Sequence, residues 1–344
     1  MTRVYITSGN SFLGKHLATE LLTQGYELRL LDLDPKMLMT TLDERLRSAL
    51  EGVDVVVHLP PEGPEEVPMR LLFDVMTEYG IGRLVLASTL EVYGEGLYAD
   101  ATGRLLVPRR ENGALDAGRW SVQDADGRPL TPMRTPETTR PDPVSAAGIA
   151  ALSREEMARA WAEAHDGQIC ILRLAGLFGP PRDSDGESPG EISRMVAMVD
   201  AGIAPSLAED GGRIRDWLHV RDAARALQLA VVSCDRGRPA MNITSGIGHS
   251  DADVVRLIAS AAFHYELEPK ALLQAQEGAA RHLVGMPGTA ETYLGFTPRL
   301  PIDNSLGELV MWVRERHGKN IPPLQPGNPA GGRDPVEIAQ DTCD

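Results

Sequence analysis

Cysteine is scarce in this chain of 344 residues, which has only three: Cys170, Cys234 and Cys343. They lie far apart, and none belongs to a Cys-x-x-Cys pair or to a Cys/His spacing typical of a metal site. A disulfide-stabilised scaffold is therefore excluded, and we predict no metal site. This cysteine usage favours a reduced chain in the cytoplasm.

Long hydrophobic runs and an excess of positive charge are also lacking. No apolar run approaches the length of a membrane-spanning helix, so we expect a soluble protein without a membrane partner. The 34 Lys and Arg residues are outnumbered by 49 Asp and Glu, giving a net charge of -15. Nucleic acids bind basic surfaces, so we expect no nucleic-acid partner, although a local basic pocket could still hold a phosphate. Residues 3–6 are typical of a strand and not of a secretion signal.

What the chain does have is an alternation of short apolar runs and amphipathic segments, which indicates β-α-β units and a parallel sheet. Hydrophobic residues make up 42% of the sequence, as in a globular protein with a sizeable core. The predicted strands are 4–7, 27–31, 53–58, 83–87 and 168–172. The predicted helices are 13–24, 69–79, 148–165, 220–232, 251–262 and 304–315.

Two regions lack this periodicity. Residues 98–140 are rich in Gly, Pro, Arg and Asp, and we predict a β-hairpin-like insertion or an ordered loop near the ligand cleft. Residues 320–344 are rich in Pro and Gly and poor in apolar residues, which favours a flexible tail over an ordered arm.

The turn between the first strand and the first helix is placed to bind a phosphate. A helix N-terminus offers unpaired amides and a positive dipole end to an anion. Asp32 follows the second strand, where an acidic residue accepts the ribose hydroxyls of a dinucleotide, and Asp34 is an alternative. Since no basic residue follows Asp32, we expect NAD in preference to NADP. A turn that only joins strand to helix is the competing interpretation.

Several longer motifs, at 84–94, 143–151, 171–180, 213–222 and 294–298, resemble the extended short-chain dehydrogenase/reductase family, the NAD-dependent epimerase/dehydratase group. The resemblance covers roughly residues 3–316. It implies a Rossmann-type doubly wound parallel sheet with a smaller C-terminal substrate-binding domain. We expect the Rossmann domain at 1–175 and 208–235, and the substrate-binding domain at 176–207 and 236–319.

The phosphate-binding turn departs from the family pattern T-G-G-x-G-F-[IL]-G. The three fingerprint glycines map to Ser8, Ser11 and Gly14, so one is kept. The resemblance implies cofactor binding by this turn, whose residues are Ser8, Gly9, Ser11, Phe12, Leu13 and Gly14. A serine at the second glycine position either donates a hydrogen bond to a phosphate or crowds it out.

The positions of the family's catalytic residues differ even more from the family pattern. The family's tyrosine and lysine, four residues apart, map to Ala147 and Ala151. A methyl group cannot move a proton, so ordinary hydride transfer is not expected. The run 84–94 resembles S-[ST]-x-E-V-Y-G, which makes Thr89 the counterpart of the catalytic serine or threonine. Glu91 and Tyr93 are candidate replacement groups, with Tyr98 and His219 as alternatives.

The substrate side keeps one arginine and loses one asparagine. Arg215 maps to the arginine that holds the diphosphate of nucleotide-sugar substrates, and an ion pair with Asp216 or Asp222 is its alternative role. The family's asparagine maps to Gly176. The resemblance also implies a homodimer that packs through the helix at 148–165.

Two functional hypotheses follow. The first is a diverged enzyme that acts on a sugar nucleotide or similar polar metabolite by acid–base chemistry, with or without NAD. The second is a catalytically inactive nucleotide-binding or assembly protein on the same fold. The family residues retained at Thr89, Glu91, Tyr93 and Arg215 favour a working cleft. The alanines at 147 and 151 favour a protein without redox activity.

Overall fold

The centre of the molecule is a six-stranded parallel sheet. The computed structural model describes residues 1–31, 39–60, 67–182, 190–235, 237–276 and 278–317. The strands run in the order β12-β8-β4-β3-β1-β2, and every neighbouring pair is parallel. Their bounds are β1 (Arg3–Ile6), β2 (Glu27–Leu30), β3 (Val55–His58), β4 (Arg83–Thr89), β8 (Gln168–Leu174) and β12 (Met241–Ile243). The predicted α/β fold with a Rossmann-type sheet is confirmed.

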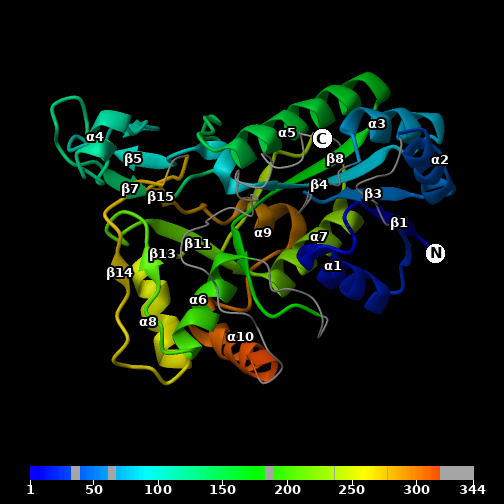
Figure 1. Cartoon of the computed structure of the whole chain (residues 1–344). Coiled ribbons are helices and arrows are strands. Elements are labelled where there is room, and N and C mark those ends of the chain that lie inside the picture. The colour runs from blue at the N-terminus through cyan, green and yellow to red at the C-terminus, as the bar shows by residue number, and fades with distance from the viewer. Residues whose placement is uncertain (32–38, 61–66, 183–189, 236, 277, 318–344) are drawn as a thin grey trace, which may run out of the picture.

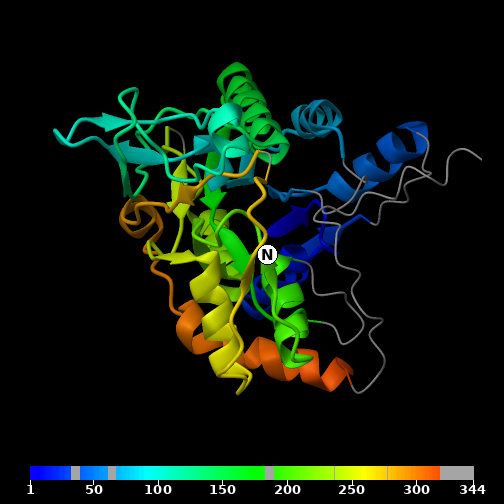
Figure 2. The same ribbon diagram turned by 60° about the vertical axis from the view of Figure 1, so that its left-hand side comes forward.

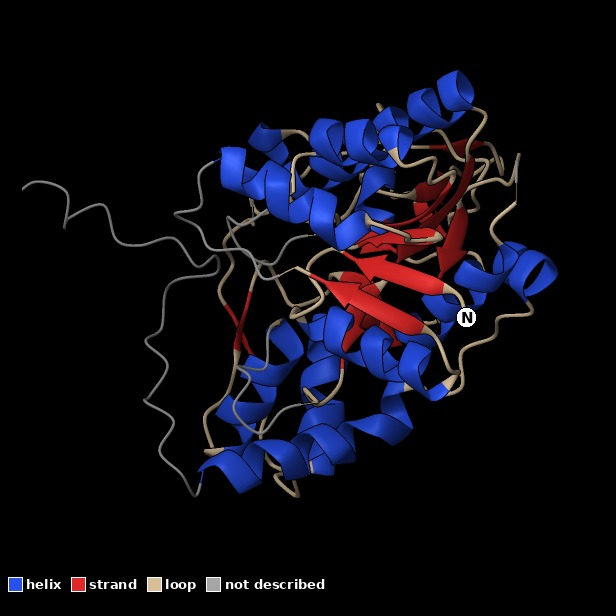
Figure 3. Ribbon diagram, turned by 90° about the vertical axis from the view of Figure 1, so that its right-hand side faces the viewer, coloured by secondary structure: helices blue, strands red, loops and turns tan. Residues whose placement is uncertain are grey.

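Helices cover both faces of this sheet (Figure 3). On one face lie α1 (Phe12–Thr23), α7 (Val220–Ser233) and α9 (Thr289–Leu294), and on the other lie α2 (Met39–Leu50), α3 (Met69–Glu78) and α5 (Ala146–His165). Side chains alternate between the faces of a strand. In β1, Val4 and Ile6 therefore pack in one hydrophobic cluster and Tyr5 in the other.

A second body lies beside the carboxyl ends of the strands (Figure 1). Its core packs between α6 (Glu191–Asp200), α8 (Asp251–Ala261) and α10 (Ile302–His317). Its small strands are β9 (Gly176–Phe178), β10 (Ser206–Leu207), β11 (Ile214–His219), β13 (Gly248–Ser250), β14 (Lys270–Ala271) and β15 (His282–Leu283). The core is a hydrophobic cluster separate from the two that flank the large sheet. On this basis we propose two domains, as expected from the sequence, but with different bounds. Strand β12 and helix α9, which were expected in the substrate-binding domain, belong to the large sheet and its cover. Strand β11, which was expected in the Rossmann domain, pairs with β13 and β15 of the second body.

The region 98–140 forms a small antiparallel sheet that projects from the molecule (Figure 2). Its elements are β5 (Leu97–Ala99), β6 (Leu105–Leu106), α4 (Asn112–Asp116) and β7 (Thr131–Met133). Strand β5 pairs with both β6 and β7, which agrees with a hairpin-like insertion. A satellite core of Tyr98, Val122 and Leu130 holds it together. The predicted tail at 320–344 lies outside the described residues.

The five strands and six helices predicted from the sequence agree with the structure to within two residues at each end. The prediction missed α2, α6 and α9, the sheet strand β12 and the small strands of the second body. It also did not predict the edge of the sheet. A standard doubly wound sheet has the order 3-2-1-4-5-6, with a strand beyond the second. Here β2 pairs with β1 on one side and is the outermost strand among the described residues. The next strand, β3, follows α2 and pairs with the other side of β1, so it does not extend the sheet beyond β2. Within the described ranges, every helix is too short or too polar to cross a membrane.

Candidate functional site

The turn between β1 and α1 is closely packed. A Cβ atom on Gly14 would lie 2.4 Å from the Ser8 carbonyl oxygen, so only glycine fits there. Ser8 takes the left-handed conformation with φ of 50°, which glycine adopts with less strain. Ser11 is the N-cap of α1, and its hydroxyl oxygen accepts a hydrogen bond of 3.0 Å from the Gly14 amide. Leu30 of β2 packs over Gly9, because its Cδ2 lies 2.5 Å from where a Cβ of residue 9 would be.

This geometry decides how far the residues fit a dinucleotide. The start of α1 lies at the carboxyl ends of the parallel strands, where doubly wound folds bind phosphates. The Ser11 hydroxyl, which accepts from Gly14, keeps its own proton as a donor for a phosphate oxygen. The turn therefore fits a phosphate. Asp32, the expected ribose ligand, lies outside the described residues.

Helix α5 does not supply the groups that hydride chemistry needs. Ala147 is exposed and Ala151 is buried in the core cluster beside the sheet. The helix is held close to the end of β4, since a Cβ on Gly148 would lie 2.6 Å from the Glu91 carbonyl oxygen. Its N-cap, Ser145, accepts a hydrogen bond from the Gly148 amide and donates one to the Glu91 carboxylate. The start of α5 is thus fixed against η1, but its side chains at 147 and 151 are methyl groups.

A cavity of about 440 Å³ lies where the large sheet meets the second body. The end of β4 and the short helix η1 (Leu90–Tyr93) form one wall, and β9, β11 and the loop before β15 form the others. Its polar and charged lining residues are Thr89, Glu91, Ser145, Glu191, Arg213, Arg215, Asp216 and Gln276. Tyrosine, lysine, histidine and cysteine are absent from the described residues that line it.

Two of the three predicted catalytic residues lie in this cavity. Thr89 accepts a hydrogen bond of 3.2 Å from the Glu91 amide through its hydroxyl oxygen, which leaves the hydroxyl proton as a donor. Glu91 is exposed, and its carboxylate is held by the Ser145 hydroxyl. A carboxylate and a hydroxyl donor on the same wall are suited to acid–base chemistry.

The third, Tyr93, points away from the cavity. It is fully buried, and its hydroxyl donates to Asn242 at 2.9 Å and accepts from the Arg173 guanidinium at 2.8 Å. Burial raises the pKa of Tyr93 to about 12, against the opposing effect of Arg173. A phenol with this pKa and with both hydrogen bonds made has a packing role here.

The same arginine forms a buried ion pair beneath the site. Arg173 makes two hydrogen bonds to the Glu155 carboxylate, at 2.9 and 2.7 Å, and both side chains are at most 5% exposed. Ser88, next to Thr89, donates to the same carboxylate at 2.6 Å. This network connects β4, α5 and β8 and fixes the strand end that carries Thr89.

Arg215 does lie in the cavity, but it pairs with carboxylates that the sequence analysis did not consider. Its guanidinium binds Asp251 through Nε and Nη2, at 2.9 and 2.6 Å, and Glu191 through Nη1, at 2.6 Å. Burial by itself would lower the pKa of Arg215, and these two carboxylates reverse the effect and raise it. The proposed alternative pairing with Asp216 or Asp222 is not what the structure shows.

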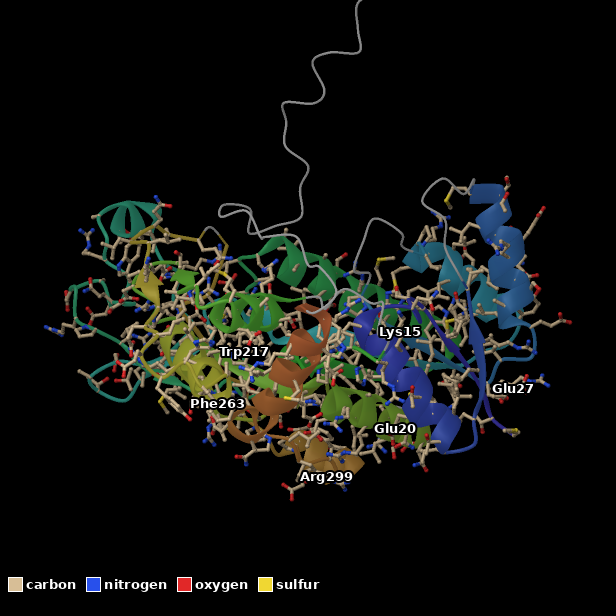
Figure 4. The ribbon with its side chains drawn as sticks, turned by 60° about the horizontal axis from the view of Figure 1, so that its bottom comes forward. Lys15, Glu20, Glu27, Trp217, Phe263 and Arg299 are labelled. Carbon is tan, nitrogen blue, oxygen red and sulfur yellow. The ribbon has the colours of Figure 1, made fainter. Side chains whose placement is uncertain are left out.

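Asp216 and Trp217 have other roles. Asp216 is buried, and burial raises its pKa although it accepts hydrogen bonds from Thr244, Ser245 and Gly246. The Arg215 guanidinium stacks on the Trp217 ring with 4.5 Å to the centroid. That ring also occupies the space next to Gly176, where a Cβ would lie 2.9 Å from it. A larger residue at 176, such as the family's asparagine, therefore does not fit without a shift of Trp217, which Figure 4 labels in the second body.

Sequence reasoning missed three cavity residues: Arg213, Glu191 and Gln276. Arg213 is 4% exposed, donates to Gln276 and lies 3.4 Å from Asp251. Burial and the neighbouring Arg215 lower the pKa of its guanidinium. The Arg-x-Arg spacing along β11 was a usable signal, because residues two apart share one face of a strand. Glu191 and Gln276 offered none, since they come from a missed helix and a loop.

The 98–140 insertion reaches the cavity through one buried arginine. Arg110 binds the Glu95 and Glu209 carboxylates, both at 2.6 Å, and donates to the carbonyl of Ala279, which lines the cavity. Arg281 completes the cluster, with its amide on Glu95 at 2.7 Å. The prediction that this region lies near the ligand cleft agrees with these contacts. In the described part of the chain, no group of His, Cys, Asp and Glu side chains is arranged to hold a metal ion.

Comparison with known proteins identifies a family and several similar enzymes. Residues 4–244 match the model of the NAD dependent epimerase/dehydratase family. A dTDP-L-rhamnose 4-epimerase of Burkholderia thailandensis is 29% identical over 248 residues, which are 71% of this chain and 66% of that protein. A UDP-glucose 4-epimerase of Thermotoga maritima, solved with UDP-glucose, is 21% identical with a TM-score of 0.71, covering 92% of this chain and all of that one (100%). MoeE5, solved with UDP-glucuronic acid and NAD, is 26% identical with a TM-score of 0.68, covering 91% and 99%.

Proposed function

Because this chain belongs to the NAD-dependent epimerase/dehydratase family, we propose that it is an enzyme that acts on a sugar nucleotide by acid–base chemistry without ordinary hydride transfer. The observation that carries this proposal is the composition of the cavity wall. It keeps Thr89 and Glu91, while the positions of the family's proton-transferring tyrosine and lysine are Ala147 and Ala151. Similar proteins are epimerases or bind UDP sugars, which supports the substrate class.

In this proposal each cavity residue has a stated task. Glu91, which Ser145 holds in position, takes a proton from a sugar carbon next to a carbonyl group, and the electron pair of the broken C–H bond moves onto the carbonyl oxygen as an enolate. Thr89 donates a hydrogen bond to that oxygen, since its own oxygen accepts one from the Glu91 amide. The substrate in this proposal is therefore a sugar nucleotide that already contains a carbonyl group. Arg215, with Arg213 beside it, binds the diphosphate, for which a planar guanidinium is suited.

NAD enters the proposal as a bound group at the turn 8–14, where the amides of α1 and the Ser11 hydroxyl would hold its phosphates. When bound, NAD supplies a reversible hydride acceptor. This chain has no phenol or ammonium at 147 and 151 to move the matching proton, which is why we propose a non-redox reaction. We further propose a cytoplasmic homodimer, as the family resemblance implies.

The alternative is a catalytically inactive nucleotide-binding protein on the same fold, which the two alanines of α5 support. The two functions differ in whether a carbon-bound proton of the sugar is exchanged. Incubation with UDP and dTDP keto sugars in D₂O, followed by mass spectrometry, detects such exchange together with any epimer or elimination product.

We expect exchange by the native chain and a loss of about 10²–10⁴-fold in Glu91→Gln and Thr89→Val, because each variant removes one acid–base group. Glu163→Gln is the matched control, since Glu163 is an exposed carboxylate on α5. Full exchange by Glu91→Gln would refute the assigned role of Glu91. Binding of the sugar nucleotides without exchange by the native chain would favour the inactive protein.

A further inference from the structure

The proposed phosphate ligand, Arg215, has its three guanidinium nitrogens already engaged. Nε and Nη2 bind one oxygen of Asp251, and Nη1 binds Glu191 at 2.6 Å. One face of the guanidinium stacks on Trp217. These bonds use three of the five N–H donors, and the two carboxylates more than balance the single positive charge. An anionic ligand therefore forms a strong ion pair with Arg215 only by displacing one of the two carboxylates.

The two carboxylates differ in how easily they can leave. The Asp251 side chain is 2% exposed and lies within 3.4 Å of Arg213 as well, so it is fixed between two cations. The Glu191 side chain is 36% exposed. Glu191 is the first residue of α6 and follows Gly190, so its charge stays near a helix N-terminus when the side chain rotates to water.

The charges at this end of the cavity also indicate Glu191 as the carboxylate that a ligand displaces. Arg213 and Arg215 together carry two positive charges, against three carboxylates: Asp251, Glu191 and Asp216, the last of which accepts hydrogen bonds from residues 244–246. Displacement of Glu191 removes the excess negative charge that an anionic ligand would otherwise meet at this end of the cavity. This end of the cavity thus has one carboxylate, that of Glu191, which can be exchanged for an anionic ligand.

We propose that Glu191 is an internal competitor of the substrate: its carboxylate occupies the position on Arg215 that the diphosphate of the ligand takes, and it rotates out when the ligand binds. This inference rests on the proposed function, because it assumes that the ligand is anionic. It goes further in naming the residue that sets the affinity and that selects ligands charged enough to displace it.

Isothermal titration calorimetry tests this with two probes, UDP and inorganic pyrophosphate. Glu191→Gln keeps the length of the side chain and removes its charge, so we expect binding about 10-fold tighter than in the native chain, the size of one charged hydrogen bond. Glu308→Gln is the matched control: Glu308 is 43% exposed and pairs with Arg221, and its loss leaves the affinity unchanged. In an Arg215→Met background the gain from Glu191→Gln disappears, because the competition takes place on Arg215.

The outcomes separate the two proposals. Tighter binding in Glu191→Gln that depends on Arg215 supports the competitor role. Equal or weaker binding in Glu191→Gln, with measurable binding by the native chain, overturns that role and leaves the proposed substrate class standing. If neither chain binds UDP or pyrophosphate, both the competitor role and the sugar-nucleotide substrate are wrong. A lower melting temperature of Glu191→Gln without an affinity gain would assign Glu191 to structure alone.

Discussion

Replacement of Arg173 by methionine provides a quantitative test of the buried network below the site. In the native chain Arg173 pairs with Glu155 through two hydrogen bonds and also donates to the Tyr93 hydroxyl. The Glu155 side chain is 0% exposed, so Arg173→Met leaves a carboxylate in the core whose remaining partners are a Ser88 hydroxyl and the more distant Arg159. Methionine fills much of the volume, and the change therefore tests charge more than packing.

The expected loss is about 3–5 kcal/mol of unfolding free energy, the usual result of removing one partner of a buried ion pair. Arg159→Met is the matched control. Arg159 lies 3.7 Å from the same carboxylate, but its side chain is 38% exposed, so the exposed pair contributes at most about 1 kcal/mol. The double variant Glu155→Leu/Arg173→Met removes both charges, and we expect it to recover at least half of the loss.

Urea unfolding followed by tryptophan fluorescence measures these differences. Trp161 of α5 stacks on Phe73 with ring centroids 5.2 Å apart, so it reports on the helix that carries Glu155. At about 3 kcal/mol per M of urea, the midpoint of Arg173→Met should fall by about 1–1.7 M. A loss in Arg173→Met no larger than in Arg159→Met would refute the argument, because the carboxylate would then have another source of compensation.

Two further predictions concern close packing and pH. Gly148→Ala should destabilise the protein by about 1–3 kcal/mol, since the new Cβ would lie 2.6 Å from the Glu91 carbonyl oxygen. In the control Gly307→Ala, in α10, the new Cβ meets nothing within 4 Å, so this variant should be more stable by up to about 1 kcal/mol. Equal melting temperatures for the two variants would contradict the packing. Burial lowers the pKa of His58 to about 3 and that of His219 to about 4, so below pH 6.5 the unfolded chain binds protons that the folded chain does not. Stability should therefore fall as the pH drops below 6.5, by about 1.4 kcal/mol per histidine at pH 5.5, and a melting temperature that stays constant from pH 7.5 to 5.5 would refute this.

The fold was largely predictable from the sequence because its signals are local. Residues such as Val55, Val56 and Val57 are apolar on both faces of a strand, which is typical of a parallel sheet covered by helices on both sides. The signals for helix starts are also local: Ser11 and Ser145 cap α1 and α5 by accepting hydrogen bonds from amides three residues further along the chain. The missed helix α6 follows a segment without such a cap, because its N-cap is Gly190.

The site was predictable only in part. Thr89, Glu91 and Arg215 were implied by the family resemblance of the runs 84–94 and 213–222, and the structure places all three in one cavity. Tyr93 was assigned to the cleft from sequence proximity, but the turn of η1 directs it into the core, where Arg173 and Asn242 meet its hydroxyl. Its partners are 80 and 149 residues away in the sequence, so no local pattern could indicate them.

The sequence by itself therefore determined the class of fold, the places where strands end, and the loss of proton-transferring groups at Ala147 and Ala151. Each of these depends on residue type and on near neighbours along the chain. Only the tertiary structure decided which charges meet, because Arg215, Glu191 and Asp251 come from three different elements that pack together. An ion pair depends on distance in space and on burial, and the sequence encodes both only through the complete fold. The packing of those elements determines which charged groups line the cavity, while Ala147 and Ala151 of α5 exclude a tyrosine–lysine proton transfer there.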